Sequence, residues 1–159
     1  MSVETYLNAA QTTIKEVDHC MLVTYGSDGL LHSRLMQPYD TEESLDIWFG
    51  TRPDSRKVEE IQADNRALVM FYNLKEAAYV SMNGTIEMVD DPELKKQYWH
   101  EAWEDYFERG PEGDDYMLLK FVPNRIEQMN FAQKVAPEPY GRVPAIMVRQ
   151  GDSWVVAEE

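Results

Sequence analysis

The spacing of hydrophobic positions changes along this chain, and each change predicts a different element. Residues 2–18 carry apolar side chains at helical spacing, behind a serine that can cap the helix. Short strand-like runs follow at residues 20–25, 30–36 and 45–50. The segment GSDG joins the first two runs and offers glycine for a positive φ. Three adjacent antiparallel strands predict a meander, which is typical of a sheet or barrel and not of alternating β–α–β units.

Two further helices are predicted downstream. In the first, Pro53 suits the first helical turn, Thr51 or Asp54 can cap it, and the helix ends near residues 64–65. The second starts at residues 90–92, DDP, where acidic side chains and proline are favourable. Its buried stripe is expected to contain Leu94, Tyr98, Ala102, Trp103 and either Tyr106 or Phe107.

Apolar runs predict the remaining strands, at residues 67–72, 79–89, 116–122, 125–131, 146–148 and 154–156. Gly84 interrupts the longest run and suggests a bulge, and Pro123 separates two of the others. Six to eight strands with two or three helices predict a single α+β, mainly β domain over residues 1–159. A small antiparallel barrel accounts for so many short strands, because it closes its own hydrogen-bonding edges.

Charge and composition narrow the classes of function. The chain has 29 acidic and 15 basic residues, a net charge of −14, and a pI of about 4.5. Such a surface argues against nucleic-acid and anionic-membrane binding. Cys20 is the only cysteine, so neither an internal disulfide nor a cysteine-based zinc site is expected. The polar N-terminal segment and the lack of an apolar run of about 20 residues predict a cytoplasmic protein.

Against this acidic background, one cluster of cations and hydroxyls requires an explanation. Arg34 lies on a predicted strand, and Thr51, Ser55, Arg56 and Lys57 surround the predicted start of a helix. A phosphate group is held by helix N-terminal N–H groups, hydroxyl donors and basic side chains, and this segment offers all three. The cluster therefore predicts a phosphate site. The alternative is a solvated helix with ordinary surface charges, because such short motifs are common.

Four segments of the chain resemble the pyridoxamine-phosphate-oxidase-like split-barrel flavoproteins, in particular the general stress protein branch. They cover about residues 20–130, in the family's order and spacing, and read MLVTYGSDGLLHSRLM, LDIWFGTRPDSRKVEEIQADNRALVMF, YVSMNGTIEMVDDPE and YFERGPEGDDYMLLKFVP. The resemblance implies a six-stranded antiparallel split barrel with flanking helices. It also implies a homodimer that binds two FMN molecules at its interface.

The resemblance assigns the phosphate of FMN to four residues. Arg34 matches the strand arginine that pairs with the phosphate. Ser55, Arg56 and Lys57 match the phosphate-binding turn.

The resemblance also assigns the rest of the flavin. Leu35 and Met36 match positions whose backbone lines the flavin ring. Gly50 and Thr51 match the strand end that follows the ring and the ribityl chain. Tyr79 falls where the oxidase has a glutamine that contacts the flavin. The segment after residue 131 does not match the oxidase's tryptophan and arginine segment, so pyridoxamine phosphate oxidase activity is not expected.

Other chemically capable residues have simpler interpretations. His19, His32 and His100 are scattered without carboxylates or cysteines at ligand spacing, so surface or core positions are expected for them. The aromatic residues between 99 and 107 could form a stacking platform, but their helical spacing favours core or dimer contacts.

Three functions from different classes stay open at this point. The first is an FMN-dependent oxidoreductase of unknown substrate, with a nicotinamide nucleotide, NADH or NADPH, as one candidate donor. The second is a flavin-binding protein without turnover, used for storage or sensing in stress physiology. The third is a split barrel that binds another ligand, such as haem or a deazaflavin, or none. A flavin spectrum separates the first two from the third, and anaerobic reduction by a nicotinamide nucleotide separates the first from the second.

Overall fold

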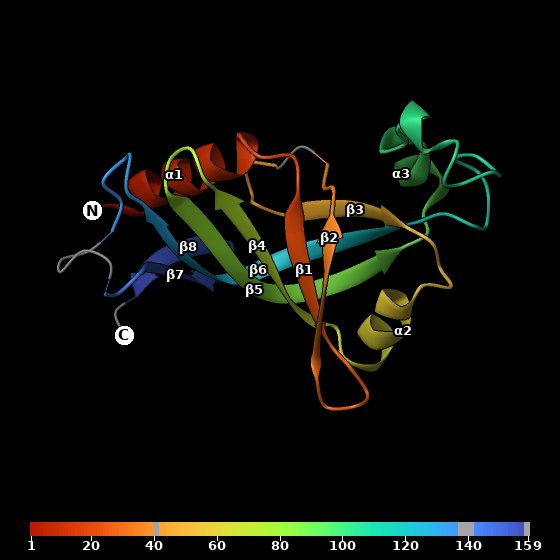
Figure 1. The fold of residues 1–159 in the computed structure, drawn as a ribbon, viewed down its shortest axis with the longest axis horizontal. Coiled ribbons are helices and arrows are strands. Elements are labelled where there is room, and N and C mark those ends of the chain that lie inside the picture. Colours follow the sequence, from red (N-terminus) through yellow and green to blue (C-terminus); the bar gives the residue numbers. More distant parts are fainter. Residues whose placement is uncertain (40–41, 137–141, 158–159) are drawn as a thin grey trace.

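The computed structural model describes residues 1–39, 42–136 and 142–157, which form a mainly antiparallel β-sheet with a few helices (Figure 1). The elements in chain order are α1 (Val3–Lys15), β1 (Cys20–Tyr25), β2 (Leu31–Met36), β3 (Ile47–Thr51), α2 (Arg56–Ala63), β4 (Arg66–Asn73), β5 (Ala78–Val89), α3 (Pro92–Gln97), the 3₁₀ turn η1 (Glu101–Trp103), β6 (Met117–Asn130), β7 (Ala145–Gln150) and β8 (Ser153–Ala157). None of the described helices is both long enough and apolar enough to span a membrane.

The long strand β6 organises the sheet. The strand order is β2-β1-β4-β5-β6-β7-β8, and β5 runs along one edge of β6. The other edge of β6 is shared: β3 pairs with Met117–Phe121, and β7 pairs with Arg125–Gln128. The prediction of an α+β, mainly β fold is confirmed. The sheet has eight strands and not six, and it does not close, since in the described ranges neither β2 nor β3 has a partner on its second side.

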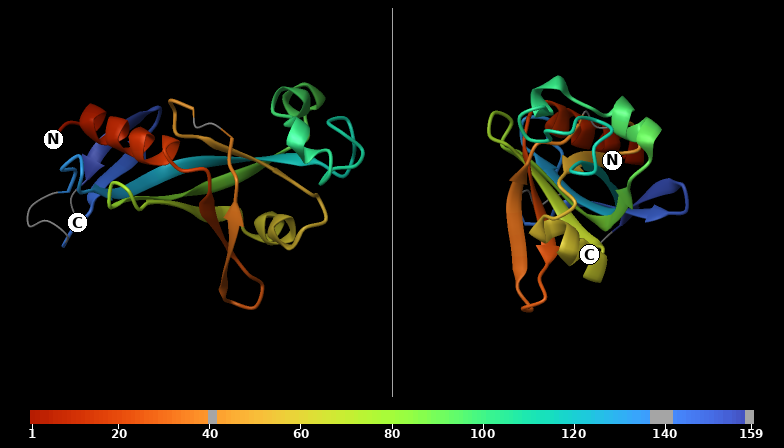
Figure 2. Two further views of the ribbon diagram at one scale, coloured as in Figure 1. Left: turned by 45° about the horizontal axis from the view of Figure 1, so that its top comes forward. Right: turned by 90° about the vertical axis from the view of Figure 1, so that its right-hand side faces the viewer.

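Helix α1 lies across the sheet near the end that carries both termini (Figure 2). Ser2 caps it as predicted, with its hydroxyl accepting from the backbone N–H of Thr5 at 3.2 Å. The helix buries one stripe against the main core, which also contains the inward side chains of β1, β3, β4, β5 and β6. That stripe comprises Tyr6, Ala9, Ala10, Thr13 and Ile14. Removal of these apolar surfaces from water is what holds the helix on the sheet.

The predicted long helix after residues 90–92 is wrong. Helix α3 ends at Gln97, and the chain continues through η1, whose first turn is capped by the ring of His100 accepting from the N–H of Ala102 at 3.1 Å. The single predicted stripe is broken, because Ala102 is exposed; Phe107, one of the two alternatives for its end, is buried, and Tyr106 is 69% exposed. The aromatic residues instead form a second cluster, packed around Trp48, Phe107, Tyr116 and Leu118.

Two predicted strands, 116–122 and 125–131, are one continuous strand. Pro123 stays within β6 because it lies opposite Gly84, where the register of β5 against β6 shifts, as predicted for a bulge. A Cβ atom added at Gly84 would lie 2.2 Å from the carbonyl oxygen of Val122, so only glycine fits there. The predicted hairpin 146–156 is present as β7 and β8.

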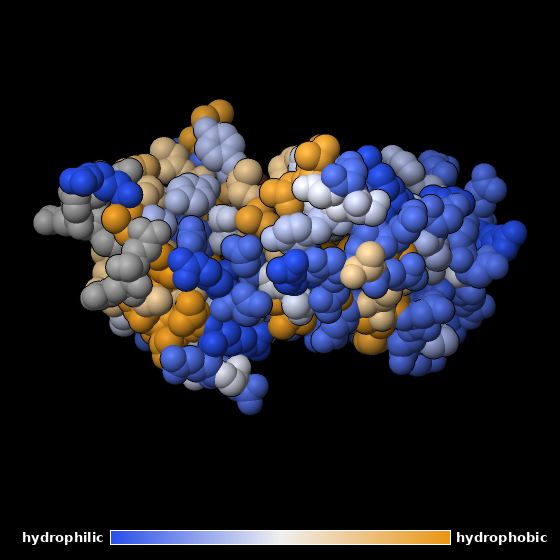
Figure 3. Space-filling view, turned by 90° about the horizontal axis from the view of Figure 1, so that it is seen from below, coloured by the Kyte–Doolittle hydropathy of each residue, from blue (hydrophilic) through white to orange (hydrophobic). Residues whose placement is uncertain are grey.

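The two ends of the molecule differ in character. Helices α2 and α3 lie at one end of the sheet, and both termini lie at the other (Figure 1). Seen from below, the surface at the α2 and α3 end is mostly hydrophilic, whereas apolar residues gather in patches toward the opposite end (Figure 3). Helix α2 packs beside β1, and its Glu60 accepts a hydrogen bond from the hydroxyl of Thr24 on that strand.

Candidate functional site

A cavity of about 310 Å³ opens where β2 and β3 end beside α2 and the aromatic segment. This volume falls at the small end of the range typical of small-molecule sites. At its rim, Leu35 and Tyr106 are 64% and 69% exposed. The lining residues are Leu35, Met36, Gln37, Gly50, Thr51, Arg52, Ser55, Lys57, Trp103, Tyr106 and Phe107.

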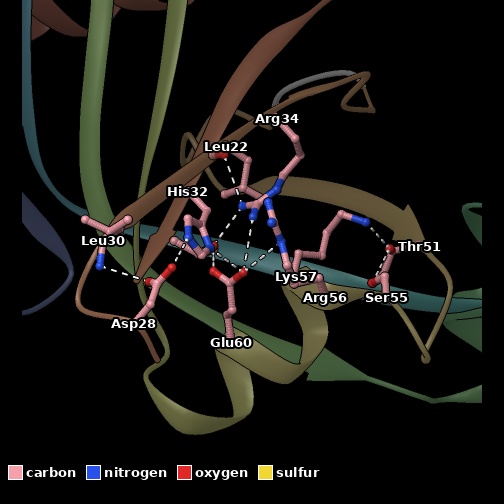
Figure 4. A network of polar contacts seen from close by, with 11 residues as sticks. Leu22, Asp28, Leu30, His32, Arg34, Thr51, Ser55, Arg56, Lys57 and Glu60 are labelled. Carbon is pink, nitrogen blue, oxygen red and sulfur yellow. Dashed lines mark hydrogen bonds and ion pairs between the residues drawn. The ribbon is translucent and has the colours of Figure 1, made fainter. Parts of the chain in front are cut away.

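Two cations line this cavity, Arg52 and Lys57, and Arg52 pairs with Asp54 at 3.2 Å. Within the described ranges, Lys57 has only hydroxyl partners. Its Nζ donates to the hydroxyl of Thr51 at 2.9 Å, and that hydroxyl lies 3.4 Å from the hydroxyl of Ser55 (Figure 4). No acidic side chain lies within 4.0 Å of this Nζ among the residues that the structure describes. Burial and, after it, the positive charge of Arg34 lower the pKa of Lys57. An anion bound here would meet an unneutralised ammonium and two hydroxyls.

Helix α2 begins later than the sequence suggests. Its first residue is Arg56 and its N-cap is Ser55, so the predictions that Pro53 lies in the first turn and that Thr51 or Asp54 caps it are wrong. The hydroxyl of Ser55 makes no capping hydrogen bond and points toward Thr51 instead. The first N–H groups of a helix lack intrahelical acceptors, so this end of α2 favours an anion.

Arg34 lies next to the cavity, on the inner side of β2. Its Nη1 donates to the carbonyl of Leu22 at 3.2 Å and to the hydroxyl of Thr24 at 2.8 Å. Its Nη2 is buried and makes no hydrogen bond within the described residues. The nearest carboxylate oxygen, Oε1 of Glu60, is 3.8 Å away, too far for a hydrogen bond. Arg34 thus holds an unused N–H group beside Lys57.

The nine residues predicted for the site separate into three groups. Seven lie together: six of them line the cavity, and Arg34 adjoins it; the six are Leu35, Met36, Gly50, Thr51, Ser55 and Lys57. Arg56 points away, with its Nε 3.2 Å from Oε1 of Glu60 and its side chain 65% exposed. Tyr79 belongs to neither group.

Tyr79 lies far from the cavity within one chain. Gly50 pairs with Leu118 of β6, and Leu118 pairs with Val89 at the end of β5. Tyr79 lies near the other end of the same strand, roughly 33 Å away at about 3.3 Å per residue. Within one chain, Tyr79 therefore does not belong to this cavity.

The sequence favoured core or dimer contacts over a stacking platform for the aromatic residues between 99 and 107, yet Trp103, Tyr106 and Phe107 line the cavity. A Cβ atom at Gly50 would lie 2.4 Å from Cζ3 of Trp103, so the absence of a side chain at Gly50 is what lets this indole pack against the strand. Trp103 also lies edge-on to Tyr39 and Phe107. The interpretation as core holds for Phe107, whereas Tyr106 is exposed at the rim. The feature of the sequence that could have indicated this lining is the close spacing of four aromatic residues between 99 and 107.

A larger cavity, of about 610 Å³, lies between α2, α3 and the loop after residue 110. Its two lysines are both neutralised: Lys95 pairs with Asp90 at 3.1 Å, and Lys96 pairs with Glu112 at 2.9 Å. Lys95 also donates to the carbonyl of Gly113 and is almost fully buried. These contacts hold α3 to the loop and leave no free charge, so we assign the functional site to the smaller cavity.

Comparison with known proteins shows the family of this chain. Residues 7–131 match the family described as pyridoxamine 5'-phosphate oxidase like. The chain belongs to this family. The match spans both the strand that carries Arg34 and the start of α2. No curated protein sequence matches the chain at a significant level.

Solved structures share the fold of this pyridoxamine 5'-phosphate oxidase-like chain at low identity. A protein related to general stress protein 26 from Clostridium acetobutylicum is 22% identical with a TM-score of 0.71, over 81% of this chain and 91% of that one. A pyridoxamine 5'-phosphate oxidase-related, FMN binding protein from Nostoc punctiforme is 14% identical with a TM-score of 0.71, over 98% and 95%. PhzG from Burkholderia lata, in complex with tetrahydrophenazine-1-carboxylic acid, is 16% identical with a TM-score of 0.69, over 98% and 88%.

Proposed function

We propose that this protein binds FMN and acts as a flavin-dependent oxidoreductase on a substrate that is not yet known. The observation that carries the proposal is the pair of cations, Lys57 and Arg34, which both lack an acidic hydrogen-bonding partner in the described chain although the protein carries a net charge of −14. The family and an FMN-binding neighbour of the same fold support the same cofactor.

The residues present fit a terminal phosphate. Lys57 and the free Nη2 of Arg34 supply positive charge, and the hydroxyls of Thr51 and Ser55 supply donors. The start of α2 adds backbone N–H groups and the positive end of a helix dipole. A site for one terminal phosphate favours FMN over FAD.

The remaining lining fits a planar ring system. Leu35, Met36, Gly50 and the side chains of Trp103 and Tyr106 present an apolar and aromatic wall beside the phosphate site. Such walls exclude water and orient a ring for reaction. When bound, FMN supplies the electron-transfer chemistry, and the protein groups place the ring and set its electrostatic surroundings.

The composition of the cavity also keeps a second function open. No histidine, aspartate or glutamate belongs to the cavity lining found among the described residues, so residue-based acid–base catalysis has few candidates there. Storage or sensing of FMN without turnover fits this lining as well as catalysis by the flavin alone does. Anaerobic bleaching by NADH or NADPH, followed by turnover with an added acceptor, would support the oxidoreductase.

We further propose a homodimer with the flavin between the subunits. The flavin contact predicted for Tyr79 requires such a dimer, because this residue does not reach the cavity within one chain. The outer face of β1, β2 and β4 supports the dimer, since Leu31, Leu35 and Tyr72 are 63%, 64% and 59% exposed there.

Titration of the protein with FMN and with riboflavin tests the proposal. Both ligands carry the same ring, so a difference in affinity reports the phosphate site. We expect FMN to bind at least about ten-fold more tightly, the equivalent of one charge-assisted contact of about 1.4 kcal/mol or more. Equal affinities would remove the phosphate assignment, and no binding of either ligand would remove the flavin.

A further inference from the structure

A buried carboxylate, that of Glu60, lies behind the proposed phosphate site and contacts donors from three elements. Its Oε2 accepts from the hydroxyl of Thr24 at 2.7 Å, and its Oε1 lies 2.9 Å from Nδ1 of His32. The same Oε1 pairs with Nε of Arg56 at 3.2 Å and with Nη2 of Arg34 at 3.8 Å (Figure 4). Only 6% of the Glu60 side chain is exposed, so its charge has little help from water.

His32 lies between two carboxylates. Its Nδ1 faces Glu60 at 2.9 Å, and its Nε2 faces Oδ2 of Asp28 at 3.1 Å. A neutral imidazole has one N–H group and can donate to only one of them, whereas an imidazolium donates to both. Gly26 leaves room for this arrangement, since a Cβ there would lie 2.5 Å from the ring and from Asp28. The hydrogen bond with Glu60 is the main cause that raises the pKa of His32.

Arg34 is connected to the same carboxylate through Thr24. The hydroxyl of Thr24 has one hydrogen and gives it to Glu60, so it accepts from Nη1 of Arg34 at 2.8 Å. Nη2 lies 3.8 Å from Oε1 of Glu60, about 0.6 Å beyond ordinary hydrogen-bond distance. As long as His32 and Arg56 occupy Oε1, that N–H group stays available to a ligand.

We propose that His32 is a proton-dependent positioning residue for the phosphate site. As an imidazolium it neutralises Glu60 and leaves Arg34 free to bind the phosphate of FMN. As a neutral imidazole it no longer neutralises Glu60, whose negative charge then competes with the ligand for Arg34. This inference rests on the proposed function and adds regulation by pH to it.

The charges around His32 also predict that its protonation strengthens phosphate binding. The groups that face it are Asp28 from the β1–β2 turn, Glu60 and Arg56 from α2, and Arg34 from its own strand. With a neutral His32, these two acids and two arginines cancel. Protonation adds one positive charge to a site that must accept a phosphate dianion, so it strengthens binding both by charge and by freeing Arg34.

Titrations with FMN and riboflavin across about pH 6 to 9 test the inference, on the wild type and on His32→Asn. The phosphate of FMN itself titrates near pH 6, equally for both proteins, so the comparison removes its effect. We expect the FMN affinity of the wild type to fall roughly ten-fold more than that of the variant over this range. Riboflavin affinity should show no such difference. Parallel FMN profiles for the two proteins would overturn the inference.

Two further measurements keep the test independent of how well His32→Asn folds. Linkage requires that FMN raise the pKa of His32 in the wild type, which its ring NMR signals report directly; an unchanged pKa would overturn the inference. In Glu60→Gln the competing charge is gone, so binding near pH 9 should exceed that of the wild type. If Glu60 were only structural, Glu60→Gln would instead weaken FMN binding at every pH, and its affinity would change with pH as steeply as that of the wild type.

The two proposals fail differently. Wild-type protein that binds no FMN at any pH would remove the proposed function and this inference together. FMN that binds more tightly than riboflavin, but with parallel pH profiles in wild type and His32→Asn, would leave the proposed function standing and remove this inference alone.

Discussion

At the scale of single residues, the account depends on two cationic side chains that have no acidic hydrogen-bonding partner in the described chain. Lys57 contacts only hydroxyls, and Arg34 retains an unused N–H group, in a protein where most cations have acidic partners. Burial, followed by the proximity of another cation, explains why the pKa of Lys57 is lowered. Holding two such groups together is unfavourable in the absence of an anion, and this cost is what makes the place a candidate binding site.

Replacement of Lys57 by methionine should weaken FMN binding about ten-fold or more, because it removes a charge-assisted contact worth roughly 1.5–3 kcal/mol. Riboflavin binding should not change. Lys75→Met is a matched control, because Lys75 is exposed in the turn between β4 and β5. Fluorescence titrations give all four affinities, and an equal loss in both variants would count against a phosphate contact at Lys57.

The pKa values around His32 also predict how stability depends on pH. The pKa of His32 is raised in the folded protein, so its stabilising effect is complete below about pH 6.5 and is lost as the pH rises through the raised value. Burial alone would raise the pKa of Glu60, but hydrogen bonds from His32 and Thr24 outweigh burial, so this pKa is lowered. A hydrogen bond from the backbone N–H of Leu30 lowers the pKa of Asp28. The contribution of both acids is therefore present above about pH 4.5 and lost in stronger acid.

It follows that the Tm difference between the wild type and His32→Asn should be largest between about pH 4.5 and 6.5 and should shrink in alkali. Circular dichroism melts at a series of pH values give the difference. A gap that stays constant to pH 9 would mean that packing, and not the protonated ring, is what the variant removes.

At the scale of elements, the bulge between β5 and β6 lets one strand serve both halves of the sheet. Gly84→Ala should destabilise the fold by about 1–3 kcal/mol, because the new methyl group would meet the carbonyl oxygen of Val122 at 2.2 Å. Asn83→Ala is the matched control one residue away, exposed on the same strand, and should stay within about 0.5 kcal/mol. Urea unfolding measures both, and similar values would show that the backbone adjusts at no cost.

Most elements could be predicted because their patterns are local. Ser2 capped α1, GSDG made a hairpin with Gly29 at a φ of 80°, and the apolar runs became strands. The failures came from distant contacts. A proline was compatible with β6 only because a glycine lies opposite, and the aromatic stripe after residue 97 was divided between the second core cluster and an exposed rim. Periodicity along one segment contains neither fact.

In the candidate site, too, local features could be predicted from the sequence and distant contacts could not. The proximity of Arg34 to Lys57, Thr51 and Ser55 followed from a strand and a helix start that sequence could indicate. The link from His32 through Glu60 to Arg34 could not be predicted, because it joins β2, β1 and α2 through side chains that are separated by up to 36 positions in sequence. His32 was accordingly interpreted as a surface or core residue without a role.

At the scale of the whole molecule, the outer face of the sheet predicts assembly. Leu31, Leu35 and Tyr72 are each more than half exposed there, which is unfavourable for a lone chain in water. Light scattering should give a mass of about two chains. Tyr72→Glu should shift that mass toward one chain, and Val156→Glu on β8, where Val156 is 42% exposed, should not. A wild-type monomer with full flavin occupancy would remove the dimer.

The central claim is that this acidic protein keeps a positively charged site for the phosphate of FMN. The most direct measurement is the absorbance spectrum of the protein after incubation with FMN and removal of free ligand, with mass analysis of what denaturation releases. The account predicts a flavin spectrum and the release of about one FMN per chain. A protein that emerges colourless, or that retains haem or another chromophore in place of flavin, would contradict it.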